Sequence, residues 1–361
     1  MDGQPKYIEQ DGVIYYPIGA GGKRSKLNKV LSSNTDDIIM EQAMECIDHF
    51  KPDVINVFGT ERCFSLVAQK TNVPVVIHIQ GMLIPYLNAY LPPSVSLCNE
   101  IFKNNNLRGI FQRYRQYHDL YKKGAVREKV ILENSRYFIG RTTWDKNIVN
   151  LYNPNATYFY GGEILRSEFY SADGRKNLPE KLVIVTTISD VPYKGFDMVV
   201  KCAHIIKEQI CKDFEWNVFG NIDENKIEKK YRGLLKKNNV ILRGVANAET
   251  LIEYLSNCTC FVHPSYIDNS PNSVCEAQIL GCPVVAQYVG GVPSLINHEE
   301  TGILVPANDP YQMAIYIKKL FEDRLYNIRI GEESRIQALK RHNKGVITDN
   351  LIHIYHLVQK G

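Results

Sequence analysis

The stretch DNSPNSVCEAQILGCPVV, residues 268–285, places small polar residues between two carboxylates, Asp268 and Glu276. It follows the apolar run CFVHPS, residues 260–265, and it ends inside another apolar run, PVVAQ, residues 283–287. Short β-branched runs separated by a helix-length segment are typical of parallel strands joined by a crossover helix. The stretch therefore predicts a strand, a loop, a helix and a second strand of an α/β domain.

The start of this helix has the features of an anion site. Ser270 is predicted as its N-cap, and Pro271 suits its first position. The first backbone amides of a helix have no partner within it and lie at the positive end of its dipole. The amides predicted to be free are those of Asn272, Ser273 and Val274. The small side chains nearby would let a phosphate approach these amides.

The two carboxylates suggest carbohydrate binding beside that anion site. Glu276, inside the helix, is placed to accept hydrogen bonds from ribose hydroxyls. Asp268, at the entrance of the loop, is placed to do the same for a sugar. A capped helix with two solvated carboxylates explains these residues equally well when they are considered alone.

Both halves of the chain alternate short apolar strands with helical patterns. Strands are predicted at residues 53–58, 73–79, 136–141, 182–187, 215–220, 240–244, 258–265 and 283–287. A polar, turn-rich stretch at 165–181 separates the halves. The pattern is typical of parallel sheets covered on both faces. We expect two doubly wound Rossmann-like α/β domains, 1–170 and 171–345, and a final helix, 346–361, that crosses back onto the first.

Composition excludes several classes of protein. The chain has 361 residues, a net charge of +4 and a pI near 8.4, which is less basic than expected for a nucleic-acid-binding protein. Its nine cysteines include no CxxC pair, so neither a zinc site nor any other metal site is predicted, and reduced thiols in a cytosol are expected. No apolar run reaches the length of a spanning helix. We expect a cytoplasmic protein, at most peripheral to a membrane.

Longer segments resemble a known family. VILRG (240–244), HPSYIDNSPNSVCEAQ (263–278), GCPVVA (281–286), VGGVPSLI (289–296) and TGILVPANDP (301–310) resemble glycosyltransferase family 4, retaining nucleotide-sugar enzymes of the GT-B fold. The family's hallmark is two acidic residues eight positions apart, which Asp268 and Glu276 match. The resemblance covers the chain from about Lys181 onward. It is weaker in the first half, where KPDVINV, VPVVIHIQG and FIGRTTWDKNIV stand in the expected order.

The resemblance implies a role for each matching residue. Glu276 would hold the ribose of the donor, and Asp268 would contact its sugar. Lys194 matches a lysine that grips the diphosphate. The family pairs this lysine with an arginine that is missing here, and Ser189 stands nearest to that position. The resemblance also assigns contacts with the sugar and the phosphates to the loop and the helix start, at Asn269, Ser270, Asn272, Ser273 and Val274. It assigns recognition of the base to the end of a strand, at Arg243 and Gly244.

In the first half, HIQG at 78–81 resembles a loop that commonly contains His-Gly. Gln80 stands in place of that histidine, and Gly81 matches. Glutamine cannot transfer a proton at neutral pH. It therefore fits the retaining mechanism usually proposed for the family, in which the leaving phosphate takes the proton of the acceptor. His78 and His263 are predicted to be packing residues.

Two segments depart from the family or remain open. From the resemblance, no counterpart of the family's first strand, glycine loop and long helix is expected in this sequence, and Gly19–Ser25 is predicted to be a mobile basic loop rather than a phosphate loop. Residues 106–129 are rich in basic and aromatic residues, and their spacing is typical of a helix. They suit either a solvated helix with some core aromatics or a surface for anionic lipid headgroups or a lipid-linked acceptor.

The sequence thus predicts a retaining glycosyltransferase that moves a hexose from a nucleotide diphosphate sugar to a hydroxyl of a glycan or lipid-linked acceptor. Bacterial surface polysaccharide synthesis is the expected setting, and no cofactor is expected. Two alternatives stay open. A non-hydrolysing nucleotide-sugar epimerase would need proton-transferring carboxylates and histidine, against which Gln80 argues. A non-catalytic nucleotide-sugar-binding subunit would fit the atypical start and the missing arginine.

Overall fold

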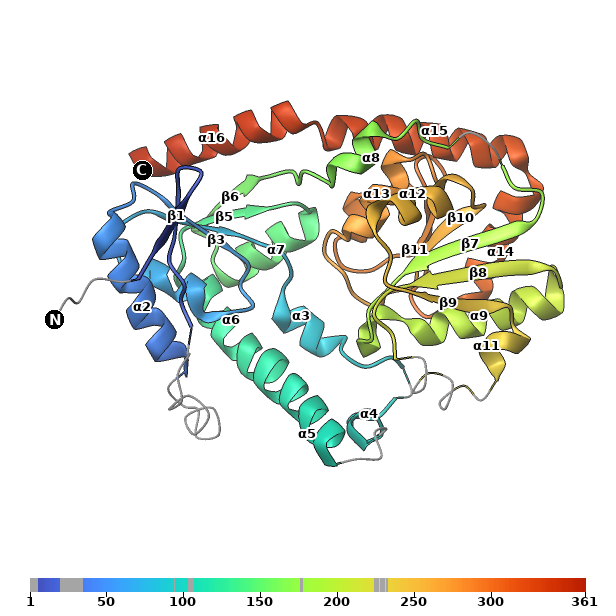
Figure 1. The fold of residues 1–361 in the computed structure, drawn as a ribbon, viewed down its shortest axis with the longest axis horizontal. Helices are drawn as coiled ribbons and strands as arrows, with labels where there is room; N and C mark the ends of the chain where they lie inside the picture. The colour runs from blue at the N-terminus through green and yellow to red at the C-terminus, as the bar shows by residue number, and fades with distance from the viewer. Residues whose placement is uncertain are drawn as a thin grey trace.

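The computed structural model describes residues 6–19, 35–93, 95–102, 107–175, 178–223, 227, 231 and 233–361. These residues form two α/β domains that lie side by side, each built on a parallel sheet (Figure 1). The architecture confirms the predicted fold class of two doubly wound Rossmann-like domains. The predicted loop Gly19–Ser25 lies, apart from its first residue, outside the described residues.

The first domain has a four-stranded parallel sheet in the order β3-β4-β5-β6. The strands are β3 (Ile55–Phe58), β4 (Val75–His78), β5 (Tyr137–Gly140) and β6 (Thr157–Tyr160). The central strands β4 and β5 are buried along their whole length, as expected for apolar strands covered on both faces. Ile77 and Phe138 are fully buried at their centre.

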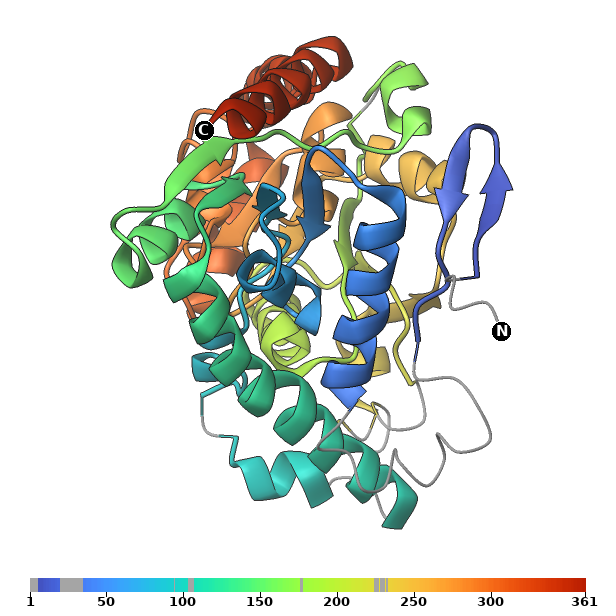
Figure 2. The same ribbon diagram turned by 90° about the vertical axis from the view of Figure 1, so that its left-hand side faces the viewer.

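Helices and a hairpin surround this sheet. They are the hairpin β1 (Ile8–Gln10) and β2 (Val13–Tyr15), α2 (Thr35–Phe50), the 3₁₀ helix η1 (Cys63–Gln69), α3 (Leu83–Asn88), α4 (Leu97–Phe102), α5 (Leu107–Arg115), the π-helix η2 (Gln116–Lys122), α6 (Lys123–Asn134) and α7 (Thr143–Tyr152). The hairpin stands beside α2, away from the sheet (Figure 2). The helices from α3 to α6 replace a single crossover between β4 and β5, and α5 lies at the lower end of the domain (Figure 1).

The second domain has a six-stranded parallel sheet in the order β12-β11-β10-β7-β8-β9. Its strands are β7 (Leu182–Thr187), β8 (Phe214–Phe219), β9 (Val240–Gly244), β10 (Cys260–His263), β11 (Val284–Gln287) and β12 (Ile303–Val305). Its helices are α8 (Ser167–Ser171), η3 (Pro192–Lys194), α9 (Phe196–Gln209), α11 (Leu234–Lys237), α12 (Ala248–Ser256), α13 (Asn272–Ile279), η4 (Val292–Ser294), α14 (Pro310–Glu322) and α15 (Arg324–Arg341).

Two apolar cores hold this second sheet. One contains Trp216 and Met198 and lies under α9 and α14, and the other contains Phe261 and lies under α12 and α13. Leu165 and Phe169, from the turn-rich stretch between the halves, are buried in the second of these cores. This stretch therefore packs as part of the second domain.

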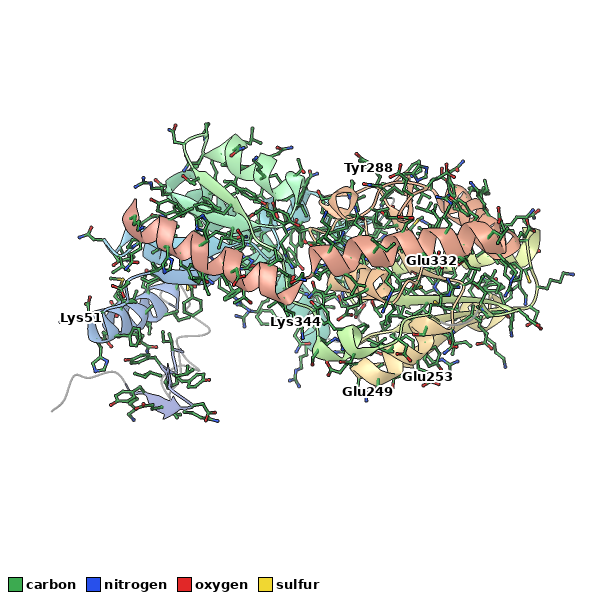
Figure 3. All side chains as sticks on the ribbon, turned by 90° about the horizontal axis from the view of Figure 1, so that it is seen from above. Lys51, Glu249, Glu253, Tyr288, Glu332 and Lys344 are labelled. Atoms are coloured by element: carbon green, nitrogen blue, oxygen red, sulfur yellow. The ribbon has the colours of Figure 1, made fainter. Side chains whose placement is uncertain are left out.

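The last helix, α16 (Lys344–Lys360), returns to the first domain. Ile354 and Val358 pack there against Val76 and Ile139. The Tyr355 hydroxyl accepts a hydrogen bond of 2.8 Å from the Asn56 amide. Seen from above, α15 and α16 run across both domains, with Lys344 at the bend between them (Figure 3). The chain thus crosses between the domains twice, after β6 and after α15.

The two crossings meet at His342, which follows α15. Its Nε2 accepts a hydrogen bond of 3.1 Å from Arg341, so its Nδ1 carries the proton and donates to the Glu163 carbonyl at 2.7 Å. The Tyr170 hydroxyl donates to the His342 carbonyl at 2.8 Å. Burial, together with the charges of Arg341 and Arg141, lowers the pKa of His342 to about 3. The ring is therefore neutral in the folded protein.

This neutral ring predicts an acid-dependent loss of stability. Because the ordinary histidine pKa is about 6.5, the unfolded chain takes up a proton below that pH while the folded ring does not until about pH 3. The free energy of unfolding should fall as pH falls through this window, by roughly 2 kcal/mol between pH 7 and pH 5 from His342 alone. Urea unfolding at pH 7, 6 and 5 measures this slope.

The His342→Gln variant should lose about that part of the slope, although its stability at pH 7 is lower because a buried hydrogen-bonding ring has been replaced. The matched control is His353→Gln, on the exposed face of α16, which should keep the wild-type slope. Equal slopes for the wild type and His342→Gln would show that the ring titrates normally in the fold.

Candidate active site

The loops after β7 and β10 touch because one residue between them is a glycine. Gly195 has φ 76° and follows Lys194, and a Cβ on it would lie 1.9 Å from the Pro264 carbonyl oxygen. A side chain would therefore separate the two loops. Their contact brings the Lys194 ammonium to 2.6 Å from Oδ2 of Asp268. These residues lie at the carboxyl ends of the strands, where open parallel sheets bind ligands.

Asp268 is buried and surrounded by polar groups. Its Oδ1 accepts hydrogen bonds from the Asn269 amide at 3.1 Å and the Tyr86 hydroxyl at 3.4 Å. The Nε2 of His263 lies 3.2 Å from Oδ2. Burial alone would raise the pKa of the Asp268 carboxyl, but Lys194 and His263 outweigh burial and hold that pKa below its ordinary value. Asp268 is therefore an ionised carboxylate paired with Lys194.

The helix α13 starts one residue later than predicted. Its N-cap is Pro271, with φ −68° and ψ 119°, so the assignment of the N-cap to Ser270 is wrong. The proline ring fixes a φ that suits either position, and the extended ψ puts Pro271 outside the helix. Its carbonyl accepts from the Val274 amide at 3.0 Å, so that amide is not free. Among the described residues, nothing accepts from the backbone amides of Asn272 and Ser273.

The side chains of this loop bind the first domain. The side-chain Oδ1 of Asn269 accepts from the Thr142 hydroxyl at 2.7 Å, and its Nδ2 donates to Oδ2 of Asp145 at 3.0 Å. Thr142 and Asp145 also form the capping box of α7. The side-chain amide of Asn272 donates from Nδ2 to Oε1 of Glu163 at 3.2 Å. These contacts tie the side chain of Asn269 to the first domain while the two domains stay in this arrangement.

Glu276 is engaged by an arginine. Arg166, in the segment that leaves the first domain, donates from Nε and Nη2 to the two carboxylate oxygens at 2.8 and 2.9 Å. Its guanidinium also lies 4.7 Å from the centre of the Phe169 ring. Arg166 was not expected from the sequence. Glu276 is therefore held in place by a bidentate ion pair.

A second cation, Arg141, lies on the first-domain side of the junction. It follows β5, is 6% exposed, and donates to the Gln80 carbonyl at 3.2 Å. Its Nη1 forms an ion pair with Glu163, which also binds Asn272 at the start of α13. Its Nε has no partner among the described residues. Burial lowers the pKa of Arg141. The sequence did not single out this residue, although it is the last residue of a predicted strand.

The remaining predicted residues lie on the same edges of the two sheets, and of these Gln80 contacts Arg141. Gln80 and Gly81 follow β4, and Gly81 is buried beside Tyr86. Ser189 is exposed after β7. Arg243 is exposed at the end of β9, where its Nε donates to Asn217 at 2.8 Å, and Gly244 has φ 70°. Within the described residues, Ser189, Arg243 and Gly244 form no hydrogen bond or ion pair with Lys194 or Asp268.

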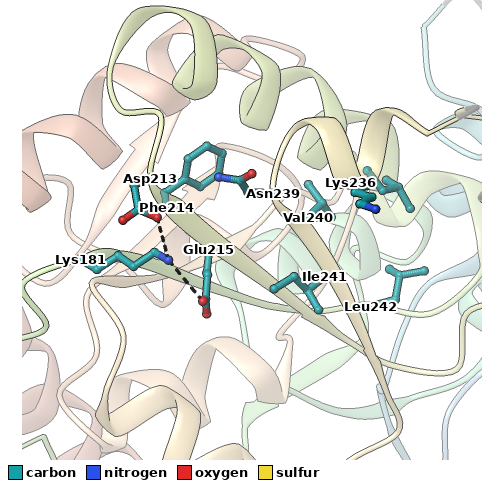
Figure 4. Close-up of a pocket in the computed structure, with 10 residues that line it drawn as sticks. Lys181, Asp213, Phe214, Glu215, Lys236, Asn239, Val240, Ile241 and Leu242 are labelled. Atoms are coloured by element: carbon teal, nitrogen blue, oxygen red, sulfur yellow. Dashed lines mark hydrogen bonds and ion pairs between the residues drawn. The ribbon is translucent and has the colours of Figure 1, made fainter.

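A surface hollow of about 670 Å³ lies at the opposite end of the second sheet (Figure 4). It is lined by the amino ends of β7, β8 and β9, and Lys181 pairs there with Asp213 at 2.9 Å. Ligands of open parallel sheets bind at the carboxyl ends of the strands, so this hollow is not the candidate site. The described part of the chain contains no group of three His, Cys, Asp or Glu residues that could hold a metal ion.

The fold and the site define a class of protein. The chain has the GT-B fold of solved glycosyltransferases. It matches sucrose-phosphate synthase from Thermosynechococcus elongatus with a TM-score of 0.69 and 19% identity, covering 99% of this chain and 86% of the other. It matches Anabaena HepE, solved in complex with UDP-glucose, with a TM-score of 0.63 and 14% identity, covering 91% and 83%.

Sequence comparison points to one family for the second domain. Residues 170–337 match the family described as glycosyl transferases group 1. The Staphylococcus aureus capsular polysaccharide biosynthesis glycosyltransferase CapM is 29% identical over 145 residues, which is 40% of this chain and 38% of CapM. The amylovoran biosynthesis glycosyltransferase AmsK of Erwinia amylovora is 26% identical over 53% of this chain and 48% of AmsK. The chain thus matches less than half the length of these relatives.

Proposed function

We propose that this chain is a retaining glycosyltransferase of family 4 type that transfers a hexose from a nucleotide diphosphate sugar to a hydroxyl of a glycan or lipid-linked acceptor. The observation that carries the proposal is the contact of Lys194 with Asp268 at 2.6 Å, in the loop that leads to the free amides of α13. The match of residues 170–337 to glycosyl transferases group 1 supports it. The names of CapM and AmsK support surface polysaccharide synthesis as its setting.

In this proposal the diphosphate binds at the start of α13. The amides of Asn272 and Ser273 donate to its oxygens, and the Lys194 ammonium neutralises charge that develops as it leaves. Arg141, from the first domain, supplies the second cation. It replaces the arginine that the family has near the position of Ser189. Asp268 accepts hydrogen bonds from the donor sugar, and Glu276 accepts them from the ribose. Arg243 and Gly244 lie at a strand end suited to the base.

The acceptor hydroxyl attacks from the first-domain side. Gln80 can orient a sugar or phosphate oxygen but cannot remove a proton at neutral pH. The leaving phosphate is therefore the group that takes the proton of the acceptor, and the new bond forms on the face that the phosphate leaves. The configuration at the anomeric carbon is retained. None of these steps needs a metal ion or a cofactor.

The test of this function is incubation of the purified chain with UDP- and GDP-sugars, followed by measurement of nucleotide release and of the anomer produced. We expect slow hydrolysis of one donor with retained configuration. Interconversion of the donor sugar would instead identify an epimerase. Binding of a nucleotide sugar without turnover would identify a non-catalytic subunit. A thermal-shift panel of nucleoside diphosphates selects the donor base.

The helix α5 supports a further part of the proposal, a peripheral contact with a membrane that carries the lipid-linked acceptor. Leu107, Phe111 and Tyr114 are 86%, 59% and 48% exposed on it. Arg108 and Arg115 are exposed on the same helix. Apolar and cationic side chains on one helix suit the interface of an anionic bilayer. None of the described helices is both long and apolar enough to cross a membrane.

We expect the protein to sediment with phosphatidylglycerol vesicles, and the double variant Leu107→Ser/Phe111→Ser to bind them roughly ten-fold more weakly, because two inserted apolar side chains are lost. The matched control is Leu325→Ser, which removes a side chain that is 81% exposed on α15. It should sediment like the wild type. Failure of the wild type to bind anionic vesicles would remove membrane contact from the proposal.

A further inference from the structure

A carboxylate on the first-domain side of the site has no role in the chemistry described so far. Glu61 follows β3, and its carboxylate lies over two glycines. A Cβ on Gly59 would lie 2.0 Å from its Oε2, and a Cβ on Gly81 would lie 3.2 Å from its Oε1. Gly59 also has φ 85°. Gly59 is therefore needed for the carboxylate to occupy its present position, and a side chain on Gly81 would crowd it.

The loop that carries Glu61 is fixed from behind by two consecutive residues of α6. Arg127 donates from Nη2 to the Glu61 carbonyl at 2.6 Å. Glu128, which is fully buried, accepts from the Thr60 hydroxyl and from the amides of Leu83 and Ile84 at 2.9 and 2.7 Å. Glu128 thus ties the Glu61 loop to the start of α3. The position of Glu61 is set by packing and hydrogen bonds rather than by an exposed, freely moving side chain.

Glu61 lies close to the donor side of the site. Tyr86, from α3, would lie 3.3 Å from a Cβ on Gly81, next to the Glu61 carboxylate, and its hydroxyl donates to Asp268 at 3.4 Å. The charge of Arg141 acts on both Glu61 and Asp268. The two carboxylates therefore flank Tyr86, one from each domain. Asp268 is paired with Lys194, whereas no cation forms an ion pair with Glu61 among the described residues.

Burial leaves the charge of Glu61 incompletely satisfied. It raises the pKa of the Glu61 carboxyl, although backbone amides of Glu61, Gly81 and Thr60 and the charge of Arg141 act against it. An ionised carboxylate has about four sites at which it can accept hydrogen bonds, and hydroxyl groups are suitable donors. A neutral polyol would stabilise this carboxylate, whereas a phosphate in the same position would be repelled by it.

We propose that Glu61 binds hydroxyls of the acceptor, and that the acceptor presents a neutral sugar, not a phosphorylated one, to this side of the site. Glu61 positions the acceptor and transfers no proton. The proposal rests on the proposed transferase function and deepens it, since it specifies the class of acceptor and the residue that selects it. Gln80, one strand away, adds an amide to the same edge of the first sheet.

The test uses the full chain and the variant Glu61→Gln, which keeps the shape of the side chain and removes its charge. The probes are the methyl α-glycosides of glucose, galactose, mannose and N-acetylglucosamine, with the corresponding sugar phosphates for comparison. Binding is followed by ligand-observed NMR in the presence of saturating nucleoside diphosphate. Donor hydrolysis by water is measured in parallel, because it requires the donor site and not the acceptor site.

We expect at least one neutral glycoside to bind the wild type, and Glu61→Gln to weaken that binding 10- to 100-fold through loss of a charge-assisted hydrogen bond. Donor hydrolysis and nucleoside diphosphate affinity should stay within two-fold. In transfer assays the variant should raise the KM for the acceptor more than it lowers kcat. Glu41→Gln, on the exposed face of α2, is the matched control and should behave as wild type.

Unchanged glycoside binding in Glu61→Gln, or preference of the wild type for sugar phosphates, would overturn the assignment of Glu61. Binding of none of the neutral glycosides would also count against it. Failure of the proposed function looks different: the wild type would then neither bind a nucleoside diphosphate nor hydrolyse a donor. A general structural defect would lower donor hydrolysis together with acceptor binding.

Discussion

Replacement of Lys194 by alanine should lower the rate of donor turnover by a factor of about 100 to 1,000, the usual effect of removing one preorganised group that stabilises charge in a transition state. The ammonium is held at 2.6 Å from Asp268 by a loop contact that only Gly195 allows. It is therefore preorganised, and little reorganisation is needed when the diphosphate begins to leave. The measurement is the kcat of nucleotide release with the preferred donor.

The same substitution removes the partner of a buried carboxylate, so some loss of stability will accompany it. Two variants separate the effects. Lys194→Arg keeps a cation near Asp268 and should recover part of the rate. Lys201→Ala removes a lysine that pairs with Asp197 at 2.8 Å on the exposed face of α9, and should leave the rate unchanged. A Lys194→Ala variant that is folded and turns over donor at more than a third of the wild-type rate would show that Lys194 has no part in departure of the diphosphate.

The features that could be predicted from the sequence depend on neighbours in the chain. The strand, loop and helix around Asp268 and Glu276 follow from β-branched runs, a proline and residue spacing. The contact of Lys194 with Asp268 joins loops 74 residues apart in the chain, but both follow predicted strands of one parallel sheet. Such strands end at the same edge, so the meeting of these side chains could be anticipated.

The groups that the sequence did not reveal come together only through tertiary structure. Arg141 and Glu61 each follow a strand of the first sheet, but nothing local distinguishes them from surface charges. Arg166 lies in a polar stretch whose burial depends on Leu165 and Phe169 packing into the second domain. Helix α15, without a clear apolar periodicity, was not predicted. In these elements tertiary packing outweighs local preference.

Arg166 forms an ion pair with Glu276 that the eight-residue spacing of Asp268 and Glu276 does not indicate. In the family resemblance Glu276 meets the ribose, yet in this structure both of its oxygens already accept from Arg166. A carboxylate has about four acceptor sites, so two remain for ribose hydroxyls. Arg166 belongs to the segment that connects the domains. We therefore expect Arg166 to orient Glu276 rather than to compete with the nucleotide.

Replacement of Glu276 by alanine should weaken binding of the preferred nucleoside diphosphate about 100- to 10,000-fold, because two hydrogen bonds to a charged acceptor are lost, each worth roughly 1.5–3 kcal/mol. Isothermal titration calorimetry of wild type and variant measures this ratio.

The matched control is Arg166→Ala, which breaks the same ion pair but leaves the carboxylate. It should change the affinity by less than ten-fold. Equal losses in the two variants would mean that the ion pair, and not a contact of Glu276 with the ribose, supports binding. An unchanged affinity in Glu276→Ala would place the ribose elsewhere.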